Sequence, residues 1–280
     1  MRQPARSGRP HLPAQERAVR QLTSDASAPA DATSGAGHTA VELDLLRSGR
    51  IELVGRLVES SNNALLARLR GAAAEKLAWV PGGDSPLDGL GRGFYAVWKP
   101  TAGERPLFDF PVRTLTRREV AAFAVSEALG WAIVPSTVLR DGPYGEGMLQ
   151  RWVEVDPGAD VVAILTGDDP RLRRIALFDA IVNNTDRKGG HILPIDGGRH
   201  VHGVDHGVCF SSVPKLRTVL WGWRGQRFSA DELAGLARIR EGLDADLGAR
   251  LRELLAPAEI RATSRRVDGL LESGRFPLPS

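Results

Sequence analysis

The sequence is poor in cysteine and has no long apolar run. Cys209 is the single cysteine among 280 residues, so no disulfide bond can form within the chain. This excludes a disulfide-stapled scaffold and is typical of a reducing compartment, so we expect a cytoplasmic protein. No stretch approaches the roughly 18 consecutive apolar residues of a transmembrane helix. We therefore expect no integral membrane association.

Lysine is also scarce, and the positive charge is concentrated in one segment. Only four of the 37 basic residues are lysines, and the rest are arginines. Where so arginine-rich a chain keeps a lysine, a chemical reason for that choice is indicated. Residues 1–40 contain five arginines against three acidic residues, which accounts for two of the three net positive charges. The remainder is nearly neutral, and we expect no nucleic-acid partner.

What is present predicts a globular domain behind a disordered tail. Residues 1–40 lack periodic apolar positions and are rich in Ala, Pro, Ser, Gly and Arg, which is typical of disorder. The rest has the apolar patterning of regular structure. The expected elements are a helix at 41–47, strands at 51–58, 64–69 and 94–99, a helix at 116–129, strands at 133–139 and 147–153, a helix at 170–183, strands at 192–195 and 200–204, and helices at 229–240, 244–255 and 257–273. This order predicts an α+β fold with a β-rich N-lobe (41–155) and a helical C-lobe (156–280), which together form one domain.

The densest polar segment follows the helix expected at 170–183. It reads Asn183-Asn184-Thr185-Asp186-Arg187-Lys188-Gly189-Gly190-His191, and Val204-Asp205-His206-Gly207 comes shortly after it. The two short strands between these motifs would form a hairpin and bring Asp186, His191 and Asp205 together. Phosphoryl transfer needs such a set, in which one carboxylate orients the attacking hydroxyl and other ligands hold a metal that bridges phosphates. The glycine after Asp205 would allow the turn that aims its carboxylate.

These two motifs resemble the Asn-x-Asp-Arg-His-x-x-Asn loop and the Asp-Phe-Gly motif of the phosphatidylinositol 3/4-kinase-like and HipA-like kinases. More narrowly, the chain resembles an actinobacterial family of phosphatidylinositol-kinase-like proteins. The resemblance covers about residues 50–255. It implies a two-lobe protein-kinase-like fold, ATP with Mg²⁺ or Mn²⁺ as cofactors, and transfer of the γ-phosphoryl group to a hydroxyl acceptor. The acceptor stays open between a small molecule, a lipid and a protein.

The resemblance also implies roles for particular residues. Asp186 would orient or deprotonate the acceptor, while Arg187 and Lys188 would lie where negative charge develops or would stabilise the loop. His191 and Asp205 would bind the metal. The residues implied for nucleotide binding are Lys99 and its partner Glu119 near the phosphates, Ser61 and Asn62 in the turn over them, and Gln150 and Trp152 in the segment that holds adenine.

Two alternative functions and one alternative role for Glu119 remain beside this interpretation. His191 stands where the family has Asn, and Lys188 where it has His, so a nucleotide-binding pseudokinase that senses or scaffolds is the second hypothesis. Glu119 could form a capping box with Thr116 instead of an ion pair, which would leave Glu127 as the partner of the lysine. The third hypothesis is a zinc-binding protein or zinc hydrolase that uses the histidine, aspartate and cysteine cluster at 191–209.

Overall fold

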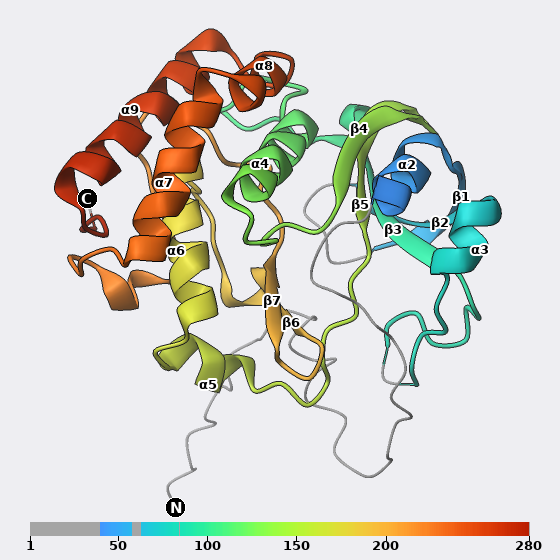
Figure 1. Cartoon of the computed structure of the whole chain (residues 1–280). Coiled ribbons are helices and arrows are strands. Elements are labelled where there is room, and N and C mark those ends of the chain that lie inside the picture. The colour runs from blue at the N-terminus through green and yellow to red at the C-terminus, as the bar shows by residue number, and fades with distance from the viewer. Residues whose placement is uncertain (1–39, 58–62, 84, 280) are drawn as a thin grey trace, which may run out of the picture.

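The computed structural model describes residues 40–57, 63–83 and 85–279. Nearly all of the tail expected to be disordered lies outside these described residues, as do the two predicted phosphate contacts Ser61 and Asn62. The described chain forms a sheet-containing part and a helical part that pack on either side of one central helix (Figure 1). The α+β, two-lobe expectation is therefore confirmed.

Five antiparallel strands form the sheet of the N-lobe, in the spatial order β1-β2-β3-β5-β4. Their bounds are β1 Arg50–Arg56, β2 Leu65–Arg70, β3 Phe94–Pro100, β4 Thr137–Gly142 and β5 Gly145–Arg151. One face of β3 carries Phe94, Ala96 and Trp98, which pack under α2 (Ala40–Ser48) and α3 (Ala72–Leu77). Because side chains alternate along a strand, Lys99 lies on the opposite face, toward the rest of the molecule.

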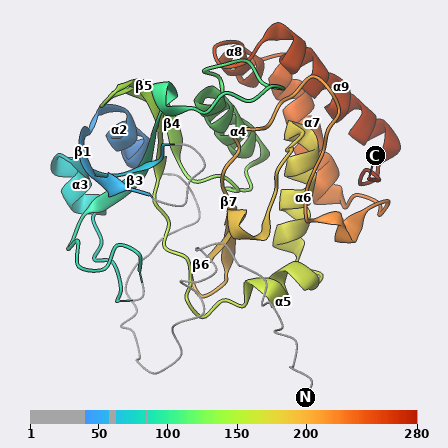
Figure 2. The same cartoon turned by 180° about the vertical axis from the view of Figure 1, so that it is seen from behind.

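Helix α4 (Leu115–Leu129) lies between the sheet and the C-terminal helices (Figures 1 and 2). Twelve of its 15 residues are buried, as expected for a helix covered on nearly all sides. It ends at Gly130, whose φ of 69° is the left-handed conformation that glycine readily adopts. Its N-terminus is held by the Glu104 carboxylate, which accepts hydrogen bonds from the backbone N–H groups of Leu115 (3.1 Å) and Thr116 (2.8 Å). The capping box expected between Thr116 and Glu119 is therefore wrong.

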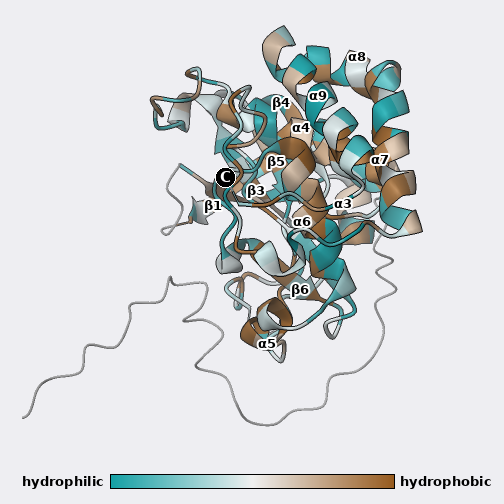
Figure 3. Ribbon diagram, turned by 90° about the vertical axis from the view of Figure 1, so that its left-hand side faces the viewer, coloured by the Kyte–Doolittle hydropathy of each residue, from teal (hydrophilic) through white to brown (hydrophobic). Residues whose placement is uncertain are grey.

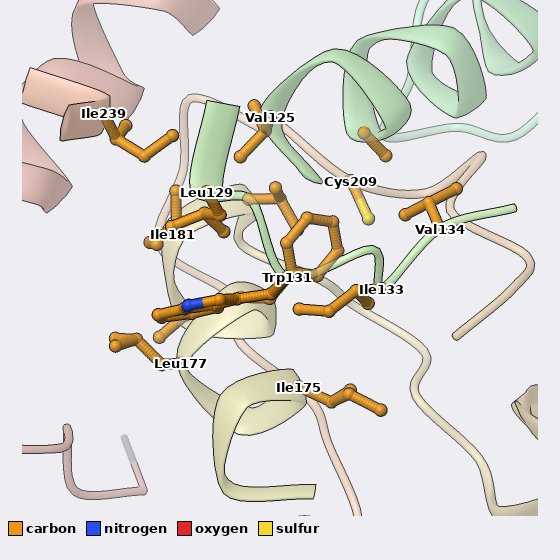
Figure 4. Packing of buried hydrophobic residues seen from close by; sticks show 14 of the residues in the cluster. Val125, Leu129, Trp131, Ile133, Val134, Ile175, Leu177, Ile181, Cys209 and Ile239 are labelled. Carbon is orange, nitrogen blue, oxygen red and sulfur yellow. The ribbon is translucent and has the colours of Figure 1, made fainter. Parts of the chain in front are cut away.

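The C-lobe is built from helices around one hydrophobic core. Its elements are α5 Val161–Thr166, α6 Pro170–Val182, β6 Ile192–Ile195, β7 His200–Gly203, α7 Ala230–Leu243, α8 Asp246–Arg252 and α9 Pro257–Ser273, together with the 3-10 helices η2 Gly189–His191 and η3 Trp221–Trp223. A further 3-10 helix, η1 Thr101–Gly103, follows β3 in the N-lobe. Figure 4 shows residues of α4 and α6 meeting in this core, with Cys209 among them. Cys209 is fully buried. Among the described residues, no helix has the length and apolar character needed to cross a membrane.

The hydropathy of the ribbon follows this division. In Figure 3, brown residues mark α6 in the interior, while teal residues lie along the outer turns of α7 and α8.

The short helices α3 and α5 were not expected, and the strand expected at 133–139 begins only at Thr137. Ile133 and Val134 are instead buried in the C-lobe core. The strand was predicted too long because a short apolar run has the same pattern in a strand and in a buried connection.

Candidate functional site

Lys99, Glu119 and Asp205 meet at the junction of the two lobes. The Lys99 Nζ lies 2.7 Å from Glu119 Oε1 and 3.1 Å from Asp205 Oδ1. The lysine comes from β3, the glutamate from α4 and the aspartate from the loop after β7. Glu127, the alternative partner, instead pairs with Arg250 at 2.6 Å. The structure therefore brings together three of the residues that the sequence indicated for nucleotide and metal binding.

The charges at this junction reinforce each other. Burial alone would lower the pKa of Lys99, but the carboxylates of Asp205 and Glu119 outweigh it and raise that pKa, so the ammonium group stays protonated. The Lys99 charge in turn holds the pKa of Asp205 well below its usual range. The Glu119 side chain is 2% exposed, whereas that of Asp205 is 43% exposed and remains accessible. The arrangement is a fixed positive charge beside an accessible carboxylate.

The turn that aims Asp205 differs from the expected one. Asp205 itself has a φ of 62°, a left-handed conformation that non-glycine residues adopt only at a cost. Gly207, which was expected to supply the turn, does not have a positive φ. A Cβ at Gly207 would lie 3.4 Å from the Leu115 Cβ, which is about van der Waals contact with α4.

His191 faces the same carboxylate from the other side. Its Nε2 lies 3.5 Å from Asp205 Oδ2, and its Nδ1 is buried without a hydrogen-bond partner in the described structure. Burial lowers the pKa of His191, which favours the neutral imidazole that can bind a metal. An ion at ligand distances of about 2.0–2.2 Å could reach both donors, so this pair suits a divalent metal.

Asp186 and Lys188 lie on the surface of the loop that follows α6. Their side chains are 47% and 62% exposed, and the Lys188 Nζ lies 2.7 Å from Asp186 Oδ2. The Asp186 backbone N–H donates to the Asn184 side chain at 3.0 Å, which fixes the start of the loop. Both residues are thus accessible to a ligand on this loop.

Arg187, in contrast, is fully buried under the loop. It pairs with Asp179 of α6 at 2.8 Å, and Asp179 also accepts hydrogen bonds from Asn184 and Thr218. Of the two roles considered for Arg187, this burial favours stabilisation of the loop. Asp179 was not among the predicted residues, although a carboxylate within the apolar stretch of α6 is a signal in itself, because a buried charge needs partners.

The residues indicated for adenine binding are partly committed to other contacts. The Gln150 Nε2 donates to Thr137 Oγ1 at 2.8 Å and the side chain is buried. The Trp152 indole donates to Glu154 at 3.1 Å, and its ring packs beside Tyr95. Gln150 lies on β5 two positions beyond Met148, the partner of Lys99, and Trp152 follows directly after the end of β5. Asn63, the described end of the predicted phosphate turn, lines a small cavity together with Lys99.

The cluster at 191–209 does not gather into a zinc site. The rings of His200 and His202 lie 4.5 Å apart on one side of β7, but their nitrogens face the backbone carbonyls of Ala132 and Ile133. Burial raises the pKa of Cys209, which keeps the thiol protonated and unsuited to metal binding. Within the described ranges, no three His, Cys, Asp or Glu side chains are arranged to hold a metal ion. The structure does not favour the zinc hypothesis.

Two solved structures, a hydra Fam20 and the Golgi casein kinase, have a similar architecture. The hydra Fam20 structure with sugar superimposes with a TM-score of 0.52 at 14% identity, covering 83% of this chain and 86% of that one. The Golgi casein kinase with Mn/ADP bound gives a TM-score of 0.55 at 14% identity, covering 82% of this chain and 74% of the other. These likenesses show the fold, which is the two-lobe protein-kinase-like fold.

The relationship in sequence is closer to a bacterial protein. Protein Rv2133c of Mycobacterium tuberculosis is 40% identical over 272 residues, which cover 84% of this chain and 91% of the relative. The chain therefore belongs to the same family as Rv2133c. No family model matches the sequence. The kinase-like part of the resemblance is confirmed at the level of fold, and the closer relation to phosphatidylinositol 3/4-kinases stays a prediction.

Proposed function

We propose that this protein is an ATP-dependent phosphotransferase that moves the γ-phosphoryl group to a hydroxyl acceptor. The observation that carries the proposal is the position of Lys99 Nζ between Glu119 and Asp205, at 2.7 and 3.1 Å. Kinases need a lysine–glutamate pair and a metal-binding aspartate in place at once. Here the three groups come from β3, α4 and the loop after β7, which is the order expected of a kinase-like fold.

In this proposal the ammonium group of Lys99 contacts the nucleotide phosphates, and Glu119 and Asp205 keep that group protonated. The site holds that charge in place before any ligand arrives, so little reorganisation accompanies phosphate binding. The segment around Gln150 and Trp152 would contact adenine. The bound Mn and ADP in the Golgi casein kinase structure support the same class of ligand here.

Asp205 and His191 would hold a divalent ion, Mg²⁺ or Mn²⁺. One carboxylate oxygen and one imidazole nitrogen facing each other are a donor set that such ions accept, with phosphate and water oxygens as the other ligands. When bound, the ion supplies positive charge that offsets the charge of the phosphates. The residues contribute the fixed spacing of the two donors.

Asp186 would orient the acceptor hydroxyl and receive its proton. Its side chain is accessible, and its backbone is fixed by Asn184, so the carboxylate can meet a ligand in a defined position. Lys188, paired with it in the described structure, would move to the transferred group as negative charge develops. Arg187 would hold the loop from beneath.

The test is phosphoryl transfer by the full chain and its Asp186→Asn variant. Each protein is given γ-labelled ATP with Mg²⁺ or Mn²⁺ and a cell extract separated into small-molecule, lipid and protein fractions. Loss of a positioned proton acceptor lowers the rate by about 10²–10⁴-fold, so the variant should lose transfer yet bind ATP normally. The exposed Asp88→Asn change is the matched control and should leave transfer intact.

Two results would overturn the proposal. Undiminished transfer by Asp186→Asn would remove the assigned role of that residue. ATP binding with no transfer to any fraction would instead favour the pseudokinase hypothesis, for which His191 in place of Asn is the motivating observation.

A further inference from the structure

Asp205 holds an unfavourable backbone conformation at the centre of the site. Its φ of 62° is rare for a residue with a Cβ, and such residues stay in this region only where the surroundings impose it. The flanking residues Val204 and His206 are therefore the places to look for what imposes it.

One guanidinium group contacts both flanks. Arg187 Nη1 donates to the Val204 carbonyl at 2.9 Å, and Arg187 Nη2 lies 2.7 Å from His206 Nε2. The same guanidinium is anchored on Asp179 at 2.8 Å, and all of these side chains are fully buried. Arg187 thus contacts the residues before and after Asp205 from a fixed point on α6.

The chemistry of this contact fixes the state of His206. A guanidinium only donates hydrogen bonds, so His206 Nε2 must accept, and the ring is neutral with its hydrogen on Nδ1. The backbone N–H of His206 also donates to Glu119 Oε2 at 2.8 Å. His206 therefore joins the loop under Asp186 to the lysine–glutamate pair, through its side chain on one side and its backbone on the other.

We propose that Arg187 and His206 are positioning residues, which clamp the chain on both sides of Asp205 and so aim its carboxylate toward Lys99 and His191. The importance of this clamp for metal and nucleotide rests on the proposed function. The clamp requires a hydrogen-bond acceptor at position 206. An apolar side chain of similar size would fill the space but leave one N–H of Arg187 Nη2 buried without a partner, while its other N–H stays on Asp179.

The test compares variants of His206 that keep or remove the acceptor. His206→Gln supplies an amide oxygen, whereas His206→Leu and His206→Phe supply none. Mn²⁺ bound in the presence of ATP is measured by electron paramagnetic resonance, which reads the ion without requiring activity. Loss of a group that orients a metal ligand weakens metal binding by about 10–100-fold, so we expect this loss in the two apolar variants and recovery in His206→Gln.

The matched control is His200→Phe, which removes another, partly buried histidine that bonds to a backbone carbonyl outside the clamp. It should bind Mn²⁺ as the wild type does. Equal Mn²⁺ affinity in wild type and in either folded apolar variant would overturn the proposal, as would failure of His206→Gln to restore it. Two apolar variants of different shape are included in case one does not fold.

A second readout separates this proposal from the proposed function. Crystal structures of the wild type and the His206 variants give the φ of Asp205 with no nucleotide required. We expect the left-handed value in the wild type and His206→Gln and its loss in the apolar variants. If the wild type binds no Mn²⁺ with ATP, the proposed function fails; an unchanged φ in the apolar variants would reject the clamp itself.

Discussion

The charge of Lys99 depends on its two carboxylate neighbours more than on solvent. The lysine side chain is 16% exposed, and burial would favour its neutral form if it stood alone. Glu119 and Asp205 reverse that tendency, so the site has a permanent positive charge where phosphates would bind. At the scale of residues, a single change at Glu119 would disturb this charge.

Glu119→Gln should destabilise the fold as well as the site. The change keeps the size of the side chain but leaves the Lys99 charge with Asp205 as its remaining partner in the described structure. Removing one member of a buried ion pair costs about 3–5 kcal/mol, and we expect the lower end of that range. Urea unfolding measures the difference.

The control for this change lies on the same helix. Glu127→Gln breaks the more exposed pair with Arg250, for which we expect less than about 1 kcal/mol. Equal losses of unfolding free energy in the two variants would contradict the special position of Glu119.

His200 predicts part of the pH dependence of stability. Burial lowers the pKa of His200, and the charge of Arg171 acts in the same direction. The bond to the Ala132 carbonyl and the charge of Asp196 act against this lowering. The His202 ring lies alongside. Because the folded pKa is below the unfolded one of about 6.5, this contribution is complete above pH 6.5 and is lost as the pH falls through the folded pKa.

His200→Gln removes this titration. The free energy of unfolding of the variant should therefore fall less between about pH 7.5 and pH 5 than that of the wild type. Urea denaturation at several pH values measures both curves, and parallel curves would show that His200 does not contribute.

At the scale of elements, the position of α4 depends on a residue that is not adjacent to the helix in the sequence. Glu104, from the loop after η1, bonds the free N–H groups of the first turn of α4. A carboxylate at a helix N-terminus satisfies these groups and interacts favourably with the helix dipole. The helix that carries Glu119 is therefore held at its start by the loop that follows β3.

Glu104→Ala should loosen that first turn. We expect a loss of about 1 kcal/mol in stability and faster hydrogen exchange at the amides of Leu115 and Thr116. Glu241→Ala, on the exposed side of α7, is the control and should change neither quantity. Unchanged exchange at the two amides in Glu104→Ala would show that the cap is not needed.

The same elements show what the sequence could predict. Strand β3 and helices α4 and α6 follow regular apolar patterns, and Gly130 and Pro170 mark an end and a start, so these elements were predictable. The cap from Glu104 was not, because the local pair Thr116 and Glu119 offered a simpler pattern. Capping by a distant residue depends on tertiary contacts that a short sequence window does not contain.

The site was predictable in part for a related reason. Motif spacing predicted Asp186, His191 and Asp205 in one region, and the structure places His191 Nε2 3.5 Å from Asp205 Oδ2. The scarcity of lysine singled out Lys99, which lies beside Asp205. The clamp formed by Arg187 was not predictable, since it depends on whether the guanidinium group lies on the buried or the exposed face of the loop. Burial decided that question.

At the scale of the whole molecule, ion pairs and the buried core connect the two lobes across α4. Arg118 of α4 is 1% exposed, pairs with Glu259 of α9 and donates to the Cys209 carbonyl at 2.6 Å. The next residue of α4, Glu119, contacts Lys99 of β3. A ligand that contacts Lys99 thus acts on a helix tied to both lobes, and its binding should stabilise the whole chain.

Thermal unfolding of the full chain with ATP and Mn²⁺ tests the central claim most directly. At about 100 times its dissociation constant, a ligand adds about 2.7 kcal/mol, which corresponds to a rise of roughly 5–10 °C for a chain of this size. We expect this rise in the wild type and in the exposed-lysine control Lys76→Met, and its loss in Lys99→Met. No rise in the wild type, or an equal rise in Lys99→Met, would contradict a nucleotide site at Lys99.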